Sequence, residues 1–330
     1  MTLVSEKTPP LGRILLAPME GVVDFQMREM LTQVGSFDRC VTEFVRVTQT
    51  LLPERVFLRY CPELSQGSRT SNGTPVYVQL LGGDPLVMAK NARRVAEMGS
   101  AGIDLNFGCP AKCVNRHDGG SILLQEPQRV KAIVQAVRDA VPATVPVTVK
   151  IRLGVRDSEL LGEVCAAIEQ VGADELCIHA RTRQDGYKPP AYWSHIKPVR
   201  EMLSIPLVVN GEIWNADDAA KARYDSQCAD VMLGRGSLAC PDLSKQIQAQ
   251  SLGQEYTPLQ WLEVLELVQQ SFNHTLPARR KYTGDTLKQW LVYLKRHYPE
   301  AERLFESIKQ FRDSNMINKV IEQHRSVVIF

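Results

Sequence analysis

The chain has 330 residues, of which 44% are hydrophobic and 23% charged, with a formal net charge of +2. These values are typical of a folded globular protein, and the charge is too mild by itself to indicate a nucleic-acid binder. No apolar signal core opens the sequence and no stretch of about 18 residues lacks a charge, so we expect neither secretion nor a membrane span.

Eight short runs rich in β-branched and apolar residues follow along the chain, beginning at residues 14, 40, 76, 102, 147, 174, 206 and 229. Amphipathic stretches lie between them, such as 127–141, where Val130, Ile133, Val134, Val137 and Val141 recur with helical period. The spacing fits one strand plus one crossover helix, repeated eight times. The sequence therefore predicts a (β/α)8 TIM barrel, with a doubly wound open sheet as the alternative.

The strand signal stops near residue 252, and helical patterns continue in "WLEVLELVQQSF", "TLKQWLVYLKRHY" and "AERLFESIKQF". We expect a catalytic barrel over 1–252 and a smaller all-helical domain over 253–330. Basic residues concentrate between 277 and 297, where Asp285 is the one acid: Arg279, Arg280, Lys281, Lys288, Lys295 and Arg296.

Polar side chains follow most of the predicted strands directly. In a barrel of this class the carboxyl ends of the strands form the active site, so these side chains should converge. The last two ends read "NGE" and "GRG", Gly-containing turns whose backbone N–H groups and Arg235 could hold a phosphate. The eight cysteines have no framework spacing, which indicates reduced thiols and a cytoplasmic protein.

Several motifs, taken in order, resemble the flavin-dependent tRNA-dihydrouridine synthases: "LLAPMEGVVD", "VQLLG", "DLNFGCPAKCVN", "VKIRLG", "IHARTRQ", "NGEI" and "MLGRG". With "TEFVRV" and "LKQWLVYLK", the chain is most similar to the bacterial C-type branch, which acts on uridine 16 of the tRNA D-loop. The resemblance extends from about residue 14 to 325. One departure is Thr286, where the C-type pattern has an arginine.

The resemblance implies FMN as the cofactor and NADPH as its reductant; no separate dinucleotide fingerprint is visible, so NADPH follows from the resemblance alone. Lys150 would place positive charge beside the side of the flavin ring that becomes negative on reduction. No metal site is expected. The cofactor-binding residues implied are Pro18, Met19, Glu20, Gln79, Lys150, His179, Asn210, Gly211, Glu212, Gly234 and Arg235, with Glu212 better suited to hydroxyls or backbone than to a phosphate.

Cys109, between a glycine and a proline, resembles the proton donor of the family. Hydride addition at C6 of uracil leaves enolate character that needs a proton at C5. A thiol is mostly protonated at neutral pH and can supply this proton, whereas a carboxylic acid is usually ionised. The remaining cysteines are interpreted as structural.

A uracil stacked in an RNA loop must leave its stack to reach a flavin in a barrel mouth. Asn106 and Arg152 are the expected readers of the uracil edge and its phosphate, and Arg46 resembles a tRNA contact. On the predicted helix from 286, we expect tRNA contacts from Lys288, Gln289, Lys295 and Arg296; a solvated helix face is the ordinary alternative. We expect tRNA as partner, no DNA, no membrane and a monomer.

Two other functions fit parts of this pattern. A flavin dehydrogenase of a free small pyrimidine, such as dihydroorotate, would use the barrel but leaves the basic helical domain without a role. An RNA-binding protein with an inactive barrel would not need Cys109, Lys150 and His179. Which tRNAs serve as substrates is not encoded in any motif.

Overall fold

The structure is a computed structural model that describes residues 12–116, 118–278 and 283–328. Its strands form one parallel sheet that closes into a barrel, because β1 pairs with β9 and β2 pairs with β4. Closure confirms the TIM barrel and excludes the open doubly wound sheet. The strands are β1 Ile14–Leu16, β2 Arg39–Val41, β3 Val45–Arg46, β4 Val76–Leu81, β5 Ile103–Phe107, β6 Val147–Arg152, β7 Glu175–His179, β8 Leu207–Asn210 and β9 Asp230–Leu233.

The second barrel position is divided between β2 and β3, both of which pair with β4. Between them, the Thr42 hydroxyl accepts a hydrogen bond from the Gln79 N–H (3.0 Å) and donates one to the Glu43 carbonyl (2.8 Å). The Thr42 side chain thus takes the place of one backbone acceptor, while the Thr42 N–H still donates to the Tyr77 carbonyl at 3.0 Å. All eight predicted runs are strand positions, whereas the split of the second was not predicted.

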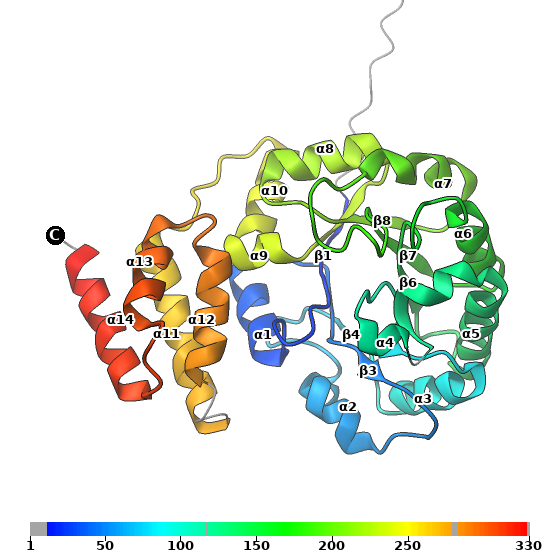
Figure 1. Cartoon of the computed structure of the whole chain (residues 1–330), viewed down its shortest axis with the longest axis horizontal. Coiled ribbons are helices and arrows are strands. Elements are labelled where there is room, and N and C mark those ends of the chain that lie inside the picture. The colour runs from blue at the N-terminus through cyan, green and yellow to red at the C-terminus, as the bar shows by residue number, and fades with distance from the viewer. Residues whose placement is uncertain (1–11, 117, 279–282, 329–330) are drawn as a thin grey trace, which may run out of the picture.

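Helices surround the barrel, as the ring of coils in Figure 1 shows. The α5 face predicted from its period is buried at Val130, Ile133, Val134 and Val137. The helices up to residue 252 are α1 Phe25–Val34, α2 Glu54–Tyr60, α3 Pro85–Glu97, α4 Lys112–Asn115, α5 Pro127–Ala140, α6 Leu161–Gln170, α7 Lys197–Met202, α8 Ala216–Ser226, α9 Arg235–Ala239 and α10 Leu243–Leu252, with 3-10 helices η1 Pro62–Gln66, η2 Gly120–Gln125 and η3 Trp193–Ile196.

Charged side chains join the strands at the amino-terminal end of the barrel. The Arg13 guanidinium contacts Asp230 at 2.5 Å and Glu175 at 2.7 Å, and Arg39 also pairs with Glu175. Asp230 opens β9 and Arg13 precedes β1, so this network joins the two ends of the barrel sequence.

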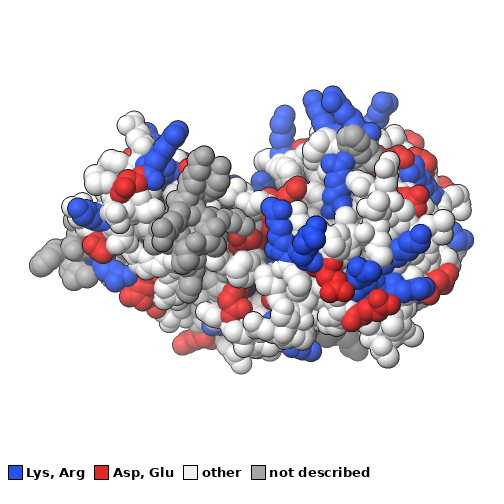
Figure 2. All heavy atoms as spheres, turned by 90° about the horizontal axis from the view of Figure 1, so that it is seen from below, with Lys and Arg blue, Asp and Glu red and all other residues white. Residues whose placement is uncertain are grey.

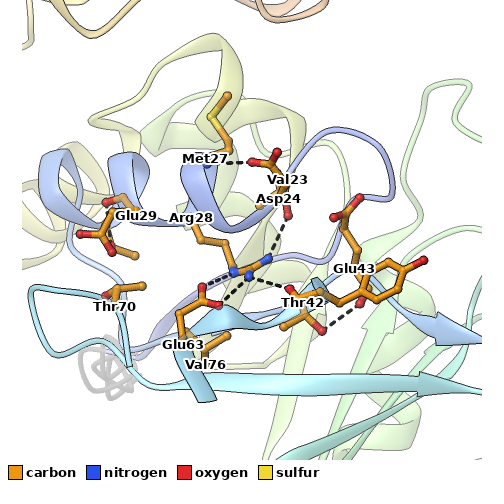
Figure 3. Close-up of polar contacts among 12 residues, drawn as sticks. Val23, Asp24, Met27, Arg28, Glu29, Thr42, Glu43, Glu63, Thr70 and Val76 are labelled. Atoms are coloured by element: carbon orange, nitrogen blue, oxygen red, sulfur yellow. Dashed lines mark hydrogen bonds and ion pairs between the residues drawn. The ribbon is translucent and has the colours of Figure 1, made fainter. Parts of the chain in front are cut away.

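A buried ion pair fixes the loop between β1 and α1 (Figure 3). Arg28 donates from Nε and Nη2 to the two carboxylate oxygens of Glu63, each at 2.9 Å, and from Nη1 to the Val23 carbonyl at 3.2 Å. A buried pair of this kind is weak evidence for stability because both charges lose water. Its structural effect is to hold α1 against η1 and to anchor the loop that carries residues 17–24.

In the described part of the chain after the barrel, the helices are α11 Trp261–Ala278, α12 Thr283–Leu294, α13 Pro299–Ile308 and α14 Ser314–Val328. The first three correspond to the predicted patterns, and α14 was not singled out. In α12 one apolar face is buried, made of Leu287, Trp290, Leu291 and Leu294. Figure 1 places these helices beside α1 and α9. Within the described ranges, no helix has the length and apolar character needed to cross a membrane.

Candidate active site

A cavity of about 640 Å³ lies among residues that follow the carboxyl ends of the strands, and every barrel position contributes to its wall. The predicted catalytic and cofactor-binding residues all line it, as do Asn106 and Arg152. The lining residues that the sequence did not single out are Ala17, Val22, Phe44, Gly108, Pro110, Ala111, Tyr187, Ile213, Trp214, Met232, Gly236 and Tyr293.

The cavity wall carries a buried cation, Lys150. Its Nζ donates to Asn210 Oδ1 at 2.8 Å, and the Asn210 amide donates in turn to the Met232 carbonyl at 2.8 Å. This chain fixes the direction of the ammonium group across β6, β8 and β9. Burial lowers the pKa of Lys150 because the charged form loses hydration.

Cys109 is half-buried in the loop after β5, and its backbone is held on both sides. Asn106 Oδ1 accepts from the Cys109 N–H at 2.9 Å, and the Cys109 carbonyl accepts from the Ser121 hydroxyl (2.9 Å) and Asn115 Nδ2 (3.0 Å). Burial raises the pKa of the Cys109 thiol, an effect that the N–H of Ala111 opposes. The arrangement keeps a protonated thiol at the cavity wall.

His179, at the end of β7, is uncharged at neutral pH. Burial lowers its pKa well below the ordinary value, and the neighbouring guanidinium and ammonium groups lower it further. Arg181 Nη1 lies 3.4 Å from His179 Nε2. Because a guanidinium only donates, Nε2 is the acceptor and the ring proton resides on Nδ1.

The turn after β8 requires glycine at Gly211, where φ is +115° and an added Cβ would lie 2.7 Å from the His179 ring. The next side chain, Glu212, accepts from Trp214 Nε1 at 2.7 Å and pairs with Arg181 and, at 3.5 Å, with Arg235. Glu212 is therefore surrounded by donors of the protein itself. Arg235, which follows β9, stands beside this carboxylate at the same end of the cavity.

Arg152 is nearly fully buried and connects three loop carbonyls. Its Nε donates to Gly108 at 2.8 Å, and Nη1 donates to Thr182 (3.0 Å) and Gly186 (2.8 Å). The residue predicted to read the substrate is therefore also a brace between the Cys109 loop and the loop after β7.

Four aromatic residues at the cavity were missed by the sequence reasoning: Phe44, Tyr187, Trp214 and Tyr293. The Arg235 guanidinium lies 5.1 Å from the Trp214 ring and 5.4 Å from the Tyr187 ring, within cation–π range. Tyr187 belongs to a loop without periodicity and gave no signal. Trp214 follows the "NGE" motif by two residues, which was the available indication.

Of the tRNA contacts predicted on the helix from 286, Lys288 and Gln289 lie on α12, whereas Lys295 and Arg296 follow its last residue, Leu294. Lys288 donates to the Phe311 carbonyl at 2.7 Å, and Lys295 lies 3.4 Å from Glu302 of α13. Arg296 instead stacks on Trp214, 3.5 Å from the ring centroid, on the barrel side, and Gln289 is exposed.

Arg46, at the end of β3, lies outside the cavity lining and donates to the Cys113 carbonyl at 3.2 Å. It therefore connects the second barrel position to the loop that carries Cys109. The upstream basic residues Arg279, Arg280 and Lys281 lie outside the described part of the chain.

Comparison with known proteins gives a consistent result. A family model for dihydrouridine synthases matches residues 15–326. The tRNA-dihydrouridine(16) synthase of Shewanella oneidensis is 50% identical over 94% of this chain and 98% of its own length. The tRNA-dihydrouridine(16) synthase of Ralstonia nicotianae is 46% identical over 94% of this chain and 96% of its own.

Two solved protein chains resemble the barrel of this chain at low sequence identity. Histamine dehydrogenase from Rhizobium sp. 4-9 has a TM-score of 0.56 at 16% identity, and 2-naphthoyl-CoA reductase with 2-naphthoyl-CoA has 0.54 at 14%. Each match covers 73% of this chain and about half of the other, 46% and 50%. At this identity the likeness supports the barrel fold alone.

Proposed function

The chain belongs to the dihydrouridine synthase family, and from this premise we propose that it reduces a uridine of tRNA, at position 16 of the D-loop, to dihydrouridine. The observation that carries the proposal is the half-buried Cys109 thiol, whose raised pKa keeps it protonated, in the wall of the cavity that Lys150 also lines. A proton donor and a cation in one cavity suit reduction of a polarised C=C bond.

FMN is the cofactor we propose for this cavity, and the donor set fits it. The neutral His179, the cationic Lys150 and the amide of Gln79 offer donors to a flavin ring, while Arg235 and the Gly211 and Gly234 turns suit its phosphate end. Reduced by NADPH, a bound flavin would supply the hydride for C6 of uracil.

The residues of this chain supply the rest of the chemistry. The Cys109 thiol would give its proton to C5, and the hydrogen bonds that the Cys109 backbone donates to Asn106 and accepts from Ser121 would keep the residue in position as the base enters. Asn106 and the braced Arg152 are the proposed readers of the uracil and its phosphate, and Tyr187 adds an aromatic surface at the cavity.

We further propose that the barrel, 1–252, holds the cofactor and that the helices of 253–330 help to bind tRNA, with Arg46, Lys288, Gln289, Lys295 and Arg296 as candidate contacts. On the face seen in Figure 2, Lys and Arg side chains gather along one edge over the barrel, whereas Asp and Glu are spread over the surface. Such an edge suits a phosphate backbone. We expect a cytoplasmic monomer.

A flavin dehydrogenase of a free small pyrimidine is the second candidate function. The two candidates differ in which molecule reoxidises the reduced flavin. Purified enzyme reduced anaerobically with NADPH is mixed with an unmodified tRNA transcript, with the same transcript carrying cytidine at position 16, or with free uridine or orotate. Rapid flavin reoxidation by the first transcript alone, with dihydrouridine mapped to position 16, is expected. Equal reoxidation by the cytidine transcript would move the target position, and reoxidation by a free pyrimidine would favour the dehydrogenase.

A further inference from the structure

One buried carboxylate beneath the cavity has no part in the function proposed so far. Asp104, the second residue of β5, has 2% of its surface exposed and does not line the cavity. Its two oxygens each accept one short hydrogen bond: Oδ2 from Gln79 Nε2 and Oδ1 from the Thr148 hydroxyl, both at 2.6 Å. Asp104 therefore joins β4 and β6 just below the predicted flavin site.

The contact with Asp104 decides how the Gln79 amide is oriented. An ionised carboxylate only accepts, so Gln79 must turn its NH₂ group toward Asp104 and its Oε1 away. That oxygen accepts from Asn106 Nδ2 at 2.7 Å. Asn106 must therefore turn its own oxygen in the opposite direction, toward the loop after β5.

The oxygen of Asn106 accepts from two successive backbone groups, the N–H of Gly108 and the N–H of Cys109, both at 2.9 Å. If the amide of Gln79 were reversed, Asn106 would have to reverse as well, and its NH₂ would face these two N–H donors. Donor would then meet donor at a site that is mostly buried, which is costly. The acceptor at Asp104 thus sets the direction of every hydrogen bond up to Cys109.

We propose that Asp104 is a positioning residue, which orients Gln79 and Asn106 through this directed chain and thereby fixes the loop that presents the Cys109 thiol. The inference rests on the proposed function insofar as Cys109 acts on a substrate, but the orientation itself is a property of the protein alone. The role proposed for Asp104 is to accept a hydrogen bond from Gln79. Neither the charge nor a proton of Asp104 takes part in the reaction.

Two substitutions distinguish the role of Asp104 as a hydrogen-bond acceptor from the role of its negative charge. Asp104→Asn removes the charge but keeps an oxygen for Gln79, while the Thr148 hydroxyl can rotate to accept from the new amide. Asp104→Leu removes both charge and acceptor at similar volume. Thr148→Val is the matched control, because it removes the other partner of Asp104 and leaves the chain toward Cys109 intact.

The readout is the rate at which iodoacetamide alkylates Cys109 in the purified full-length protein, followed by mass spectrometry of the peptide that contains it. We expect Asp104→Leu to alkylate about fivefold faster or more, the ratio that one lost hydrogen bond represents. Asp104→Asn and Thr148→Val should stay near the wild-type rate. A folded Asp104→Leu protein with the wild-type rate, or an Asp104→Asn protein as fast as Asp104→Leu, would overturn the proposal.

A measurement on the wild type covers the case in which Asp104→Leu does not fold. The side-chain NH₂ protons of Gln79 and Asn106, assigned by ¹⁵N NMR, should exchange slowly with solvent because each amide is bonded within the chain. Rapid exchange of both would contradict the proposed orientation.

Turnover then tests the consequence for the reaction. In Asp104→Leu, flavin reoxidation by tRNA should slow by roughly 10- to 100-fold, as for a displaced reacting group, with the KM for tRNA unchanged. An increase in KM alone would contradict a positioning role. If the wild-type protein does not reduce tRNA at all, the proposed function fails, while the alkylation rates still decide the role of Asp104.

Discussion

At the scale of single residues, burial sets the charge state of the site. It raises the pKa of Cys109 and lowers those of His179 and Lys150, so the thiol is protonated and the imidazole neutral at pH 7. Burial also raises the pKa of thiols in the core, for example that of the fully buried Cys165. Cys109 differs from them because it faces the cavity.

Replacing Cys109 by Ala should block proton delivery without blocking reduction of the flavin. NADPH should still bleach the flavin, because that step does not use the thiol, while reoxidation by tRNA should slow by roughly 100-fold or more, as on loss of a general acid. Stopped-flow absorbance measures both rates on one sample. The same substitution at Cys113, which is exposed and lies outside the cavity lining, should leave both rates unchanged.

The raised pKa of Cys109 also predicts the pH dependence. A general acid acts in its protonated form, and a raised pKa extends that form to higher pH. The reoxidation rate should therefore stay level across neutral pH and decline only above the ordinary titration range of a thiol. Single-turnover rates across pH test this, with Cys109→Ala as the control that should lack the alkaline decline; a decline beginning near pH 7 would point to another acid.

At the scale of elements, α12 and the residues directly after it contact both the neighbouring C-terminal helices and the barrel. Its apolar face packs inward, Lys288 and Lys295 turn toward α13 and the segment after it, and Arg296, just beyond the helix end, reaches Trp214 of the barrel. Charge clustering in sequence did not reveal this division, because partners such as the Phe311 carbonyl come from elsewhere in the chain. The basic residues of α12 should therefore differ in what they do.

Lys288→Ala should lower stability by about 1 kcal/mol through its lost hydrogen bond and, because Lys288 is one candidate tRNA contact, reduce the log–log salt slope of tRNA binding by no more than about 1. The pair Lys295→Ala and Arg296→Ala should weaken tRNA binding and reduce the log–log salt slope by up to about 2. Binding measured at several salt concentrations distinguishes the variants. Superimposable slopes for the double variant and the wild type would assign these charges to an ordinary solvated surface.

The strands and helices could be predicted from the sequence where burial of one face gives the apolar residues a regular period. The site residues could be predicted where they follow the end of a strand. The eight apolar runs and the apolar face of α5 became the elements expected, and the predicted catalytic and cofactor-binding residues line the cavity, whereas Arg46 lies outside it. The division of β2 from β3 was not predictable, since it depends on a hydrogen bond between Thr42 and Gln79, distant in sequence. Tyr187 and the second role of Arg152 as a brace likewise depend on loop contacts that leave no periodic trace.

At the scale of the whole molecule, the C-terminal helices are fastened to the barrel next to the cavity. Trp290 is buried, and its Nε1 donates to the Leu238 carbonyl of α9 at 3.0 Å, a few residues after Arg235. A second hydrogen bond, 3.3 Å from the Tyr298 hydroxyl to the Leu259 carbonyl, lies within the C-terminal part itself. A tRNA bound by these helices would thus contact a part of the protein that is packed against α9, the helix that begins at Arg235 in the cavity wall.

Trp290→Ala should therefore cost about 3–5 kcal/mol of stability, the range for removing a buried tryptophan, and should also reduce the flavin content because α9 loses its support. Denaturant unfolding and the flavin-to-protein absorbance ratio measure the two effects. Val292→Ala, on the exposed side of the same helix, should change stability by less than about 0.5 kcal/mol. Equal effects of the two substitutions would rule out a close coupling of α12 to the barrel.

The pairing of β1 with β9 determines when, during synthesis, the protein can first bind its cofactor. Leu16 and Leu233 are neighbours in the closed barrel, yet they are 217 positions apart in the chain. At about 5–20 residues per second, roughly 10–40 s pass between their emergence from the ribosome. During that interval the first strand has one open edge, and the cavity lacks the wall that Gly234 and Arg235 provide. A nascent chain should therefore be unable to retain its cofactor until the ninth strand has been made.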